Sequence, residues 1–257
     1  MLKIKIQQGW VLKRVLAVVA NMGPTALMEI LPTGLLFRVT NPAQDVSTIL
    51  GINTAAFHHY SCDEALVFEV NLQQFSSIIN SATDDEDITI CRSYDTPNLV
   101  SFVFVNNQNN EDNRNIELEV AKVEKDHWSA GDELMHEFKV CIRCEDLAHI
   151  MEHSKVNKEA ITITMMGTMV TLNSGYETLH LKEERQECII KNVPAGTRQH
   201  LQLSVNRLDS FLLVCRTTNI VWIHDSNSRS PIRPLLEFPL GDLGRLLIFL
   251  PQPFIIS

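Results

Sequence analysis

Apolar residues follow two spacings along this chain: every three or four positions, as in a helix, and every second position, as in a strand. The helical spacing occurs in several places. From Val70 to Thr89 the chain reads V-N-L-Q-Q-F-S-S-I-I-N-S-A-T-D-D-E-D-I-T, with apolar residues every three or four positions. This spacing puts the apolar side chains on one face of a helix and the polar ones on the other. Asn71 can cap the first turn, with Gln74 three residues later as in a capping box. The pattern predicts a short amphipathic helix, followed by a strand from Ile88.

The same helical pattern appears in three other places. Each copy begins with a leucine and continues with apolar residues at helical spacing; the leading residues are Leu12, Leu72, Leu147 and Leu208. They lie 60, 75 and 61 residues apart, so one longer gap separates two similar pairs. A helix with one apolar stripe must lie on another element to bury it. The spacing favours an internal duplication over four unrelated core helices.

Segments in which apolar and polar residues alternate, as in a strand, lie between these predicted helices. The sequence predicts strands at residues 2–6, 26–31, 34–39, 46–50, 64–70, 88–93, 99–105, 116–123, 138–142, 160–165, 169–172, 178–182, 220–224, 235–240 and 246–250. A parallel fold would need a helix between most strands, and there are too few helices for that. The predicted class is therefore α+β, with two similar domains of antiparallel sheets and two helices in each.

A charged stretch near the middle of the chain follows neither period. It spans residues 124–136 and contains Gly131. We therefore expect an N-terminal domain at 1–123, an interdomain connector at 124–136 and a C-terminal domain at 137–257.

Composition narrows the class of protein. Of 257 residues, 45% are hydrophobic and 21% charged, which is typical of a globular protein with an ample core. The net charge of −9 argues against nonspecific nucleic-acid binding by the whole surface, although a local basic face remains compatible with it. Six scattered cysteines indicate free thiols in a reducing compartment. No apolar run approaches the roughly 20 residues of a membrane span, so we expect an intracellular protein.

Four short motifs carry a family resemblance. They are G-W-V-L-K-R-V-L at Gly9–Leu16, Y-S-C-D at Tyr60–Asp63, V-N-L-x-x-F at Val70–Phe75 and P-L-L-E-F-P-L-G-D-L-G-R-L at Pro234–Leu246. In order and spacing the chain resembles the proliferating cell nuclear antigen family of eukaryotic DNA sliding clamps. The resemblance covers the whole length.

The resemblance implies a specific way of working. Three two-domain subunits would close head to tail into a homotrimer, with helices lining the hole and sheets outside. Duplex DNA would thread the ring, a clamp loader would place it there, and DNA polymerases, ligases and nucleases would dock by short peptides. Such a clamp is nuclear, needs no cofactor and catalyses no reaction, because it acts by preventing diffusion of its partner enzyme.

A sliding surface needs cations that touch phosphates without reading bases. The DNA-facing candidates on the predicted helices are Lys13, Arg14, His149, Lys155, Arg207 and Arg216. The second helix carries no cation, whereas the family usually has more basic residues here. Either this ring grips DNA weakly, or another subunit supplies the charge, as in a heterotrimeric checkpoint-type clamp. Any single cation also fits an ordinary solvated helix face.

Two further sites follow from the resemblance. The partner-peptide pocket would comprise Val46, Trp128, Ala130, Pro234, Phe249, Leu250, Pro251 and Gln252. The alternative is that Phe249 and Leu250 belong to the core and Trp128 anchors the connector. Subunits would join strand 116–123 to strand 178–182 of the next chain, through Glu117, Glu119, Thr178, His180 and Lys182.

Two motifs raise the alternative of an enzyme. His149, Glu152 and His153 match the H-x-x-E-H motif of a zinc hydrolase, which also needs a third ligand on a further helix. The region downstream predicts strands, so the sequence favours two solvent-facing histidines beside a glutamate, without a metal. The C-x-x-C at Cys141–Cys144 has no second pair at zinc-ribbon spacing, and buried thiols explain it better.

Overall fold

The computed structural model describes residues 2–6, 10–41, 46–83, 86–93, 95–106, 113–123, 138–193, 198–203, 208–225 and 235–250. The chain divides into two compact units. Unit 1 comprises Met1–Pro42, Ser47–His127 and Leu240–Leu246, and unit 2 comprises Ala43–Val46, Trp128–Pro239 and Leu247–Ser257. The predicted connector, residues 124–136, lies outside the described residues. Among the described helices, none is long and apolar enough to cross a membrane.

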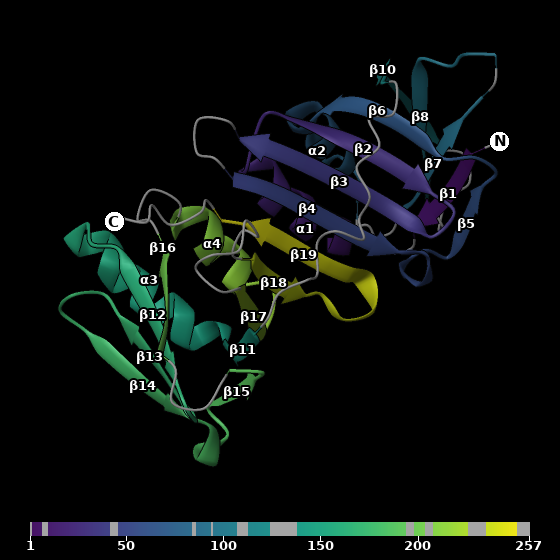
Figure 1. Cartoon of the computed structure of the whole chain (residues 1–257). Helices are drawn as coiled ribbons and strands as arrows, with labels where there is room; N and C mark the ends of the chain where they lie inside the picture. Colours follow the sequence, from purple (N-terminus) through teal and green to yellow (C-terminus); the bar gives the residue numbers. More distant parts are fainter. Residues whose placement is uncertain are drawn as a thin grey trace. The chain divides into compact units, whose positions relative to one another are not determined.

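Unit 1 contains two groups of hydrogen-bonded strands and two helices (Figure 1). One sheet has the order β5 (His59–Cys62), β1 (Leu2–Ile6), β7 (Glu86–Arg92), β8 (Leu99–Asn106), β9 (Arg114–Glu119). The other group has the order β10 (Ala121–Lys122), β6 (Leu66–Asn71), β2 (Thr25–Leu31), β3 (Gly34–Asn41), β4 (Val46–Asn53). Helices α1 (Trp10–Ala20) and α2 (Leu72–Asn80) pack against each other, and α2 contacts β2, β6 and β9.

Three phenylalanines join the layers of unit 1. Phe75 of α2 meets Phe37 of β3 and Phe102 of β8 in edge-to-face contacts, with ring centroids 5.3 and 5.4 Å apart. All three side chains are fully buried. The start of α2 follows the sequence prediction, because the Asn71 side chain accepts a hydrogen bond of 3.0 Å from the Gln74 backbone N–H. Local capping and long-range packing therefore fix the same helix.

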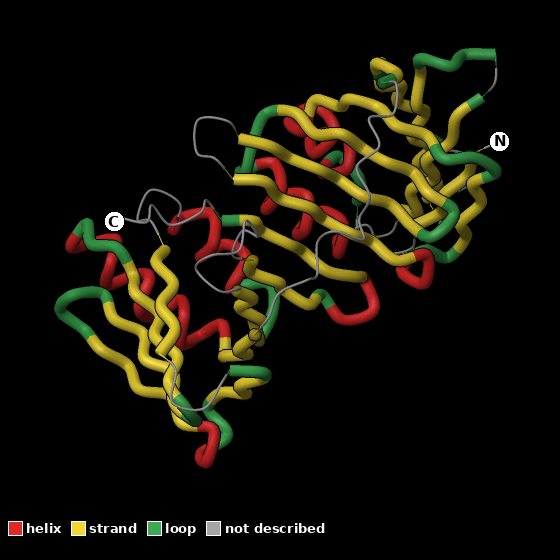
Figure 2. Tube along the Cα trace, in the orientation of Figure 1, coloured by secondary structure: helices red, strands yellow, loops and turns green. Residues whose placement is uncertain are grey.

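Unit 2 also contains two groups of strands and two helices (Figure 2). The first group has the order β18 (Leu235–Pro239), β17 (Ile220–Asp225), β11 (Phe138–Arg143), β15 (Cys188–Lys191). The second is the sheet β14 (Thr178–Lys182), β13 (Met169–Asn173), β12 (Ile161–Met166), β16 (Arg198–Leu203). Helix α3 (Cys144–Asn157) packs against α4 (Leu208–Cys215) and contacts β11, β12, β13 and β14. Strand β19 (Gly244–Phe249) is divided between the two units.

The core of unit 2 is built around the apolar stripe of α3. Leu147, Ile150 and Met151 are fully buried, and Phe211 and Val214 of α4 are buried as well. Because α3 packs against α4 as well as against four strands, this stripe joins the helices to both strand groups. Burial of such side chains is the main source of stability in a fold of this kind.

The C-x-x-C motif spans a strand end and a helix start, as the sequence predicts. Cys141 lies in β11, Cys144 begins α3, and both are free and buried. Burial raises the pKa of the Cys141 thiol, which keeps this thiol protonated and weakly nucleophilic.

The predicted α+β class with antiparallel sheets is confirmed, and all four predicted helices are present among the described residues. Three strands escaped the sequence analysis: β5, β15 and β16. The predicted strand at 116–123 is wrong in one respect, because it consists of β9 and β10, which pair with different strands. Its partner β8 begins at Leu99, so the ladder between β8 and β9 ends where Val120 N–H donates to Asn98 O.

Candidate functional site

Lys13 lies on α1, half-buried, and its ammonium group donates a hydrogen bond to the backbone oxygen of Ala82. Ala82 follows the end of α2, where unpaired carbonyl groups carry partial negative charge. Lys13 therefore links the two helices of unit 1, in addition to any role toward DNA. Arg14 lies in α1, but its side chain is outside the described part of the structure.

Three of the predicted DNA-facing residues of unit 2 are described, and they lie on or beside α3 and α4. His149 and Lys155 are exposed on α3. Arg216 directly follows α4, its side chain is 72% exposed, and Nη2 lies 3.9 Å from Oε1 of Glu152. Arg207 is outside the described residues. Lys13 and Arg216 thus each contact an acceptor of the chain itself, which weakens the attraction that they offer to a phosphate.

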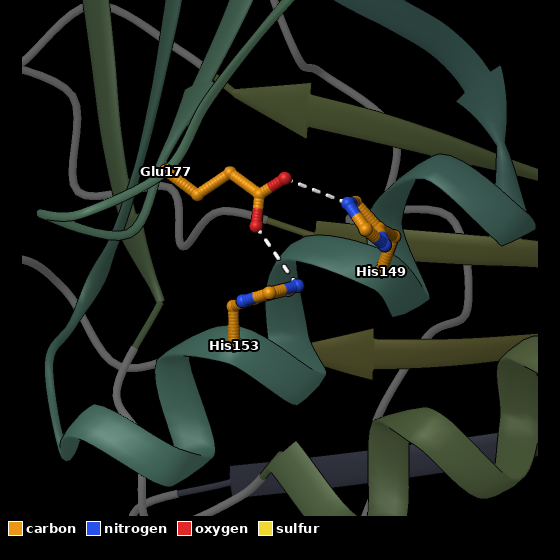
Figure 3. A group of neighbouring side chains, drawn as sticks. All are labelled: His149, His153 and Glu177. Carbon is orange, nitrogen blue, oxygen red and sulfur yellow. Dashed lines mark hydrogen bonds and ion pairs between the residues drawn. The ribbon is translucent and has the colours of Figure 1, made fainter.

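Two histidines of α3 converge on one carboxylate (Figure 3). His149 Nε2 lies 2.8 Å from Oε1 of Glu177, and His153 Nε2 lies 2.9 Å from Oε2. The histidines are one helical turn apart and share a face, while Glu177 immediately precedes β14. Both histidines are exposed, as the sequence predicts. The carboxylate that they contact, however, is Glu177 rather than Glu152 of the motif.

Glu177 was not predicted from the sequence, because the H-x-x-E-H motif requires its third ligand on a further helix. A tight turn between β13 and β14 supplies it instead: Ser174 N–H donates to the backbone oxygen of Glu177 at 2.9 Å. The register of the two strands then holds this residue opposite α3, which contacts both strands. No local spacing in the sequence signals such a contact, since it depends on strand pairing.

Strand β9 has an open edge. Val120 N–H bonds to Asn98 O, and the register pairs Glu119 with Leu99. Because residues of an antiparallel strand alternate between bonding the partner and facing away, Glu117 and Glu119 direct their backbone N–H and C=O groups away from β8. Both side chains are exposed. Among the described strands, none pairs with this edge of β9.

Strand β14 has an open edge as well. The bond from Ser174 to Glu177 sets the alternation, so Thr178, His180 and Lys182 direct their backbone groups away from β13. The Lys182 N–H donates to Oε2 of Glu187 at 2.9 Å, which closes this end of the edge. The backbone groups of Thr178 and His180 face the open edge in the described part of the sheet.

The first residue of β9, Arg114, forms an ion pair with the buried carboxylate of Glu86. Arg114 Nη2 donates to Oε2 of Glu86 at 2.7 Å, and its guanidinium lies 4.7 Å from the ring centre of Phe104. Burial alone would raise the pKa of the Glu86 carboxyl, but hydrogen bonds from Thr83 and Arg114 outweigh it, so this pKa is lowered. Glu86 therefore stays ionised and fixes the edge strand to β7.

Three of the predicted pocket residues are described. Val46 and Leu250 are buried, with 5% and 3% of their surface exposed, and Phe249 is half-buried. Phe249 and Leu250 belong to unit 2, and so does Val46, although the rest of β4 belongs to unit 1. The other five members lie outside the described residues: Trp128, Ala130, Pro234, Pro251 and Gln252. Of the described members, Phe249 therefore offers the most surface to a partner.

A comparison with known families agrees with the geometry. Residues 1–128 of the 257 match the family described as "Proliferating cell nuclear antigen, N-terminal domain". Together with the antiparallel sheets and the paired helices, this match defines the DNA-clamp fold. The chain belongs to the proliferating cell nuclear antigen family of sliding clamps. Members of this family serve DNA replication and repair, have DNA and polymerases as general partners, and in general catalyse no reaction.

Proposed function

We propose that this chain is a processivity factor that closes into a homotrimeric ring around duplex DNA and tethers polymerases and repair enzymes. The observation that carries the proposal is the pair of open edges, β9 in unit 1 and β14 in unit 2. An open edge invites another strand, and joining β9 of one subunit to β14 of the next covers both. Three such contacts of one kind can close a ring.

Charge supports this pairing. Glu117 and Glu119 are acidic on β9, whereas β14 carries Lys182 and His180. Each exposed ion pair contributes only about 0–1 kcal/mol, so main-chain hydrogen bonds would supply most of the specificity. Like edges would place carboxylates opposite each other, which disfavours joining β9 to β9.

In this ring the four helices face the hole and touch phosphates through Lys13, Arg14, His149, Lys155, Arg207 and Arg216. Replacing Lys13 and Arg14 by alanine is expected to lower DNA affinity. It should also reduce the slope of log affinity against log salt by about 1.8 per subunit, because each lost phosphate contact removes roughly 0.9. Binding to nicked circular DNA across a salt series measures both quantities.

A matched control removes two lysines elsewhere. Lys139 and Lys191 lie over the Trp222 ring at 5.1 and 5.3 Å, on strands rather than helices. Lys139→Ala with Lys191→Ala changes the net charge equally, and should leave the salt slope unchanged. If both double variants behave alike, the helices do not form the DNA-facing surface.

Partner peptides would dock at the pocket formed by Val46, Trp128, Ala130, Pro234, Phe249, Leu250, Pro251 and Gln252. A peptide with an aromatic anchor is expected to lose roughly 30-fold in affinity on Trp128→Ala, as for a hot-spot residue of about 2 kcal/mol. Fluorescence anisotropy of a labelled peptide measures it. This variant should retain DNA binding, and the Lys13/Arg14 variant should retain the peptide. Unchanged peptide affinity would remove Trp128 from the pocket.

A heterotrimeric checkpoint-type clamp is the second candidate. The observation in its favour is the low positive charge of the helices: α2 contains no cation, and Lys13, His149 and Arg216 contact acceptors of their own chain. Other subunits would then supply the cations. Such a chain would be monomeric when purified alone, and would join a ring only with its partners.

Both candidates place the chain in the nucleus, where a clamp loader opens and closes the ring on DNA. A fluorescent fusion of the full chain reports this location directly. Exclusion of the fusion from the nucleus would contradict this part of the proposal.

A further inference from the structure

We infer that His149, His153 and Glu177 form a binding site for a divalent transition-metal ion of the zinc class. All three residues belong to unit 2, and the site does not depend on ring formation. Two imidazoles and one carboxylate suit zinc, cobalt and nickel, whereas calcium and magnesium prefer sets of oxygen ligands. No reaction is assigned to the ion.

The distances fit such an ion. The three ligand atoms lie within 4.8 Å of one another, and the two nitrogen–oxygen distances are 2.8 and 2.9 Å. A tetrahedral zinc ion, with bonds of about 2.0–2.1 Å, holds its ligand atoms roughly 3.3 Å apart. Side-chain rotations that bring the three ligand atoms to this spacing would admit the ion. Figure 3 shows both imidazoles directed at the carboxylate from one face of α3.

One oxygen of the carboxylate lacks a hydrogen bond. Oε2 of Glu177 is shielded from solvent and, among the described residues, accepts none. Its neighbour His153 Nε2 is close, at 2.9 Å, but the contact lacks hydrogen-bond alignment. A shielded carboxylate oxygen without a donor costs free energy. A cation placed between the nitrogen and the oxygen would satisfy both at once.

The site is accessible and has room for further ligands. The side chains of His149 and His153 are 52% and 50% exposed, so water can reach the ion and complete its coordination. The ion would fasten the residue before β14 to α3, and so fix the start of that edge strand.

The test uses the full chain without an affinity tag, freed of metal by a chelator. Calorimetric titration with Zn²⁺ is expected to show one ion per chain, and Co²⁺ should give the visible absorption of a tetrahedral site. Glu177→Gln should lower Zn²⁺ affinity at least tenfold, because changes to outer-shell partners alone cost 10–100-fold. His153→Gln should do the same, and provides the test should Glu177→Gln fail to fold.

Two controls show whether zinc binding depends on this cluster. Glu152→Gln changes the acid of the H-x-x-E-H motif, which pairs with Arg216, and His200→Gln removes an exposed imidazole of β16. Both variants should bind Zn²⁺ like the natural chain. Absence of stoichiometric zinc, or an unchanged affinity in Glu177→Gln and His153→Gln, would overturn the inference. Equal losses in the controls would do so as well, because the ion would then be held elsewhere on the chain.

Discussion

A chain with Glu117→Pro is expected to be monomeric at concentrations where the natural chain forms a ring. The Glu117 N–H faces away from β8, so proline removes a donor for the next subunit while leaving the β8 ladder intact. The carbonyl left unpaired across each contact costs about 1–3 kcal/mol, which weakens association roughly five- to 150-fold. Sedimentation velocity over a concentration series measures the shift.

The control keeps the backbone donor and removes only the charge. Glu117→Ala should weaken the ring slightly, since an exposed ion pair contributes about 0–1 kcal/mol. Thermal melts of both variants check that the Arg114–Glu86 contact still holds β9. A fully folded Glu117→Pro chain that assembles as tightly as the natural one would exclude β9 from the subunit contact.

Replacing Phe75 by alanine is expected to lower the free energy of unfolding of unit 1 by about 3–5 kcal/mol. The side chain is fully buried and contacts Phe37 and Phe102 from two different strand groups. Its removal deletes apolar surface and leaves a cavity that the two sheets cannot both close. Urea unfolding, followed by far-ultraviolet circular dichroism, measures the change.

The matched control lies on the same helix, one turn further along. Ile78 is half-buried, whereas Leu72, Phe75 and Ile79 are buried. Ile78→Ala should cost about 1 kcal/mol, the centre of the range for ordinary substitutions. If the two variants unfold at the same urea concentration, Phe75 does not join the layers of unit 1.

The local spacing of apolar and capping residues was sufficient to predict the helices. In α2 the cap at Asn71 and the stripe of Leu72, Phe75 and Ile79 were both readable from spacing, because they depend on residues within three or four positions. The strand at 178–182 was predicted with the bounds that β14 has. That Thr178 lies at a subunit contact was predicted from the family resemblance. The hydrogen-bond register of β13 and β14 shows that its backbone groups point away from β13.

Features that depend on contacts between residues far apart in the sequence could not be predicted from it. Strand β16 shows only Leu201 and Leu203 as buried apolar residues among polar ones, so its pattern was too weak to separate from a loop. The break after β9 depends on where β8 begins. Glu177 reaches the histidines only through the pairing of β13 with β14. In each case the deciding contact lies outside the window in which periodicity is informative.

The mass of the purified chain in solution tests the central claim most directly. Static light scattering of the natural chain should give about 87 kDa, three times the 29.1 kDa of one subunit. The Glu117→Pro chain should give the mass of one subunit under the same conditions. A natural chain that remains at 29.1 kDa, alone and with nicked circular DNA, would contradict the homotrimeric ring.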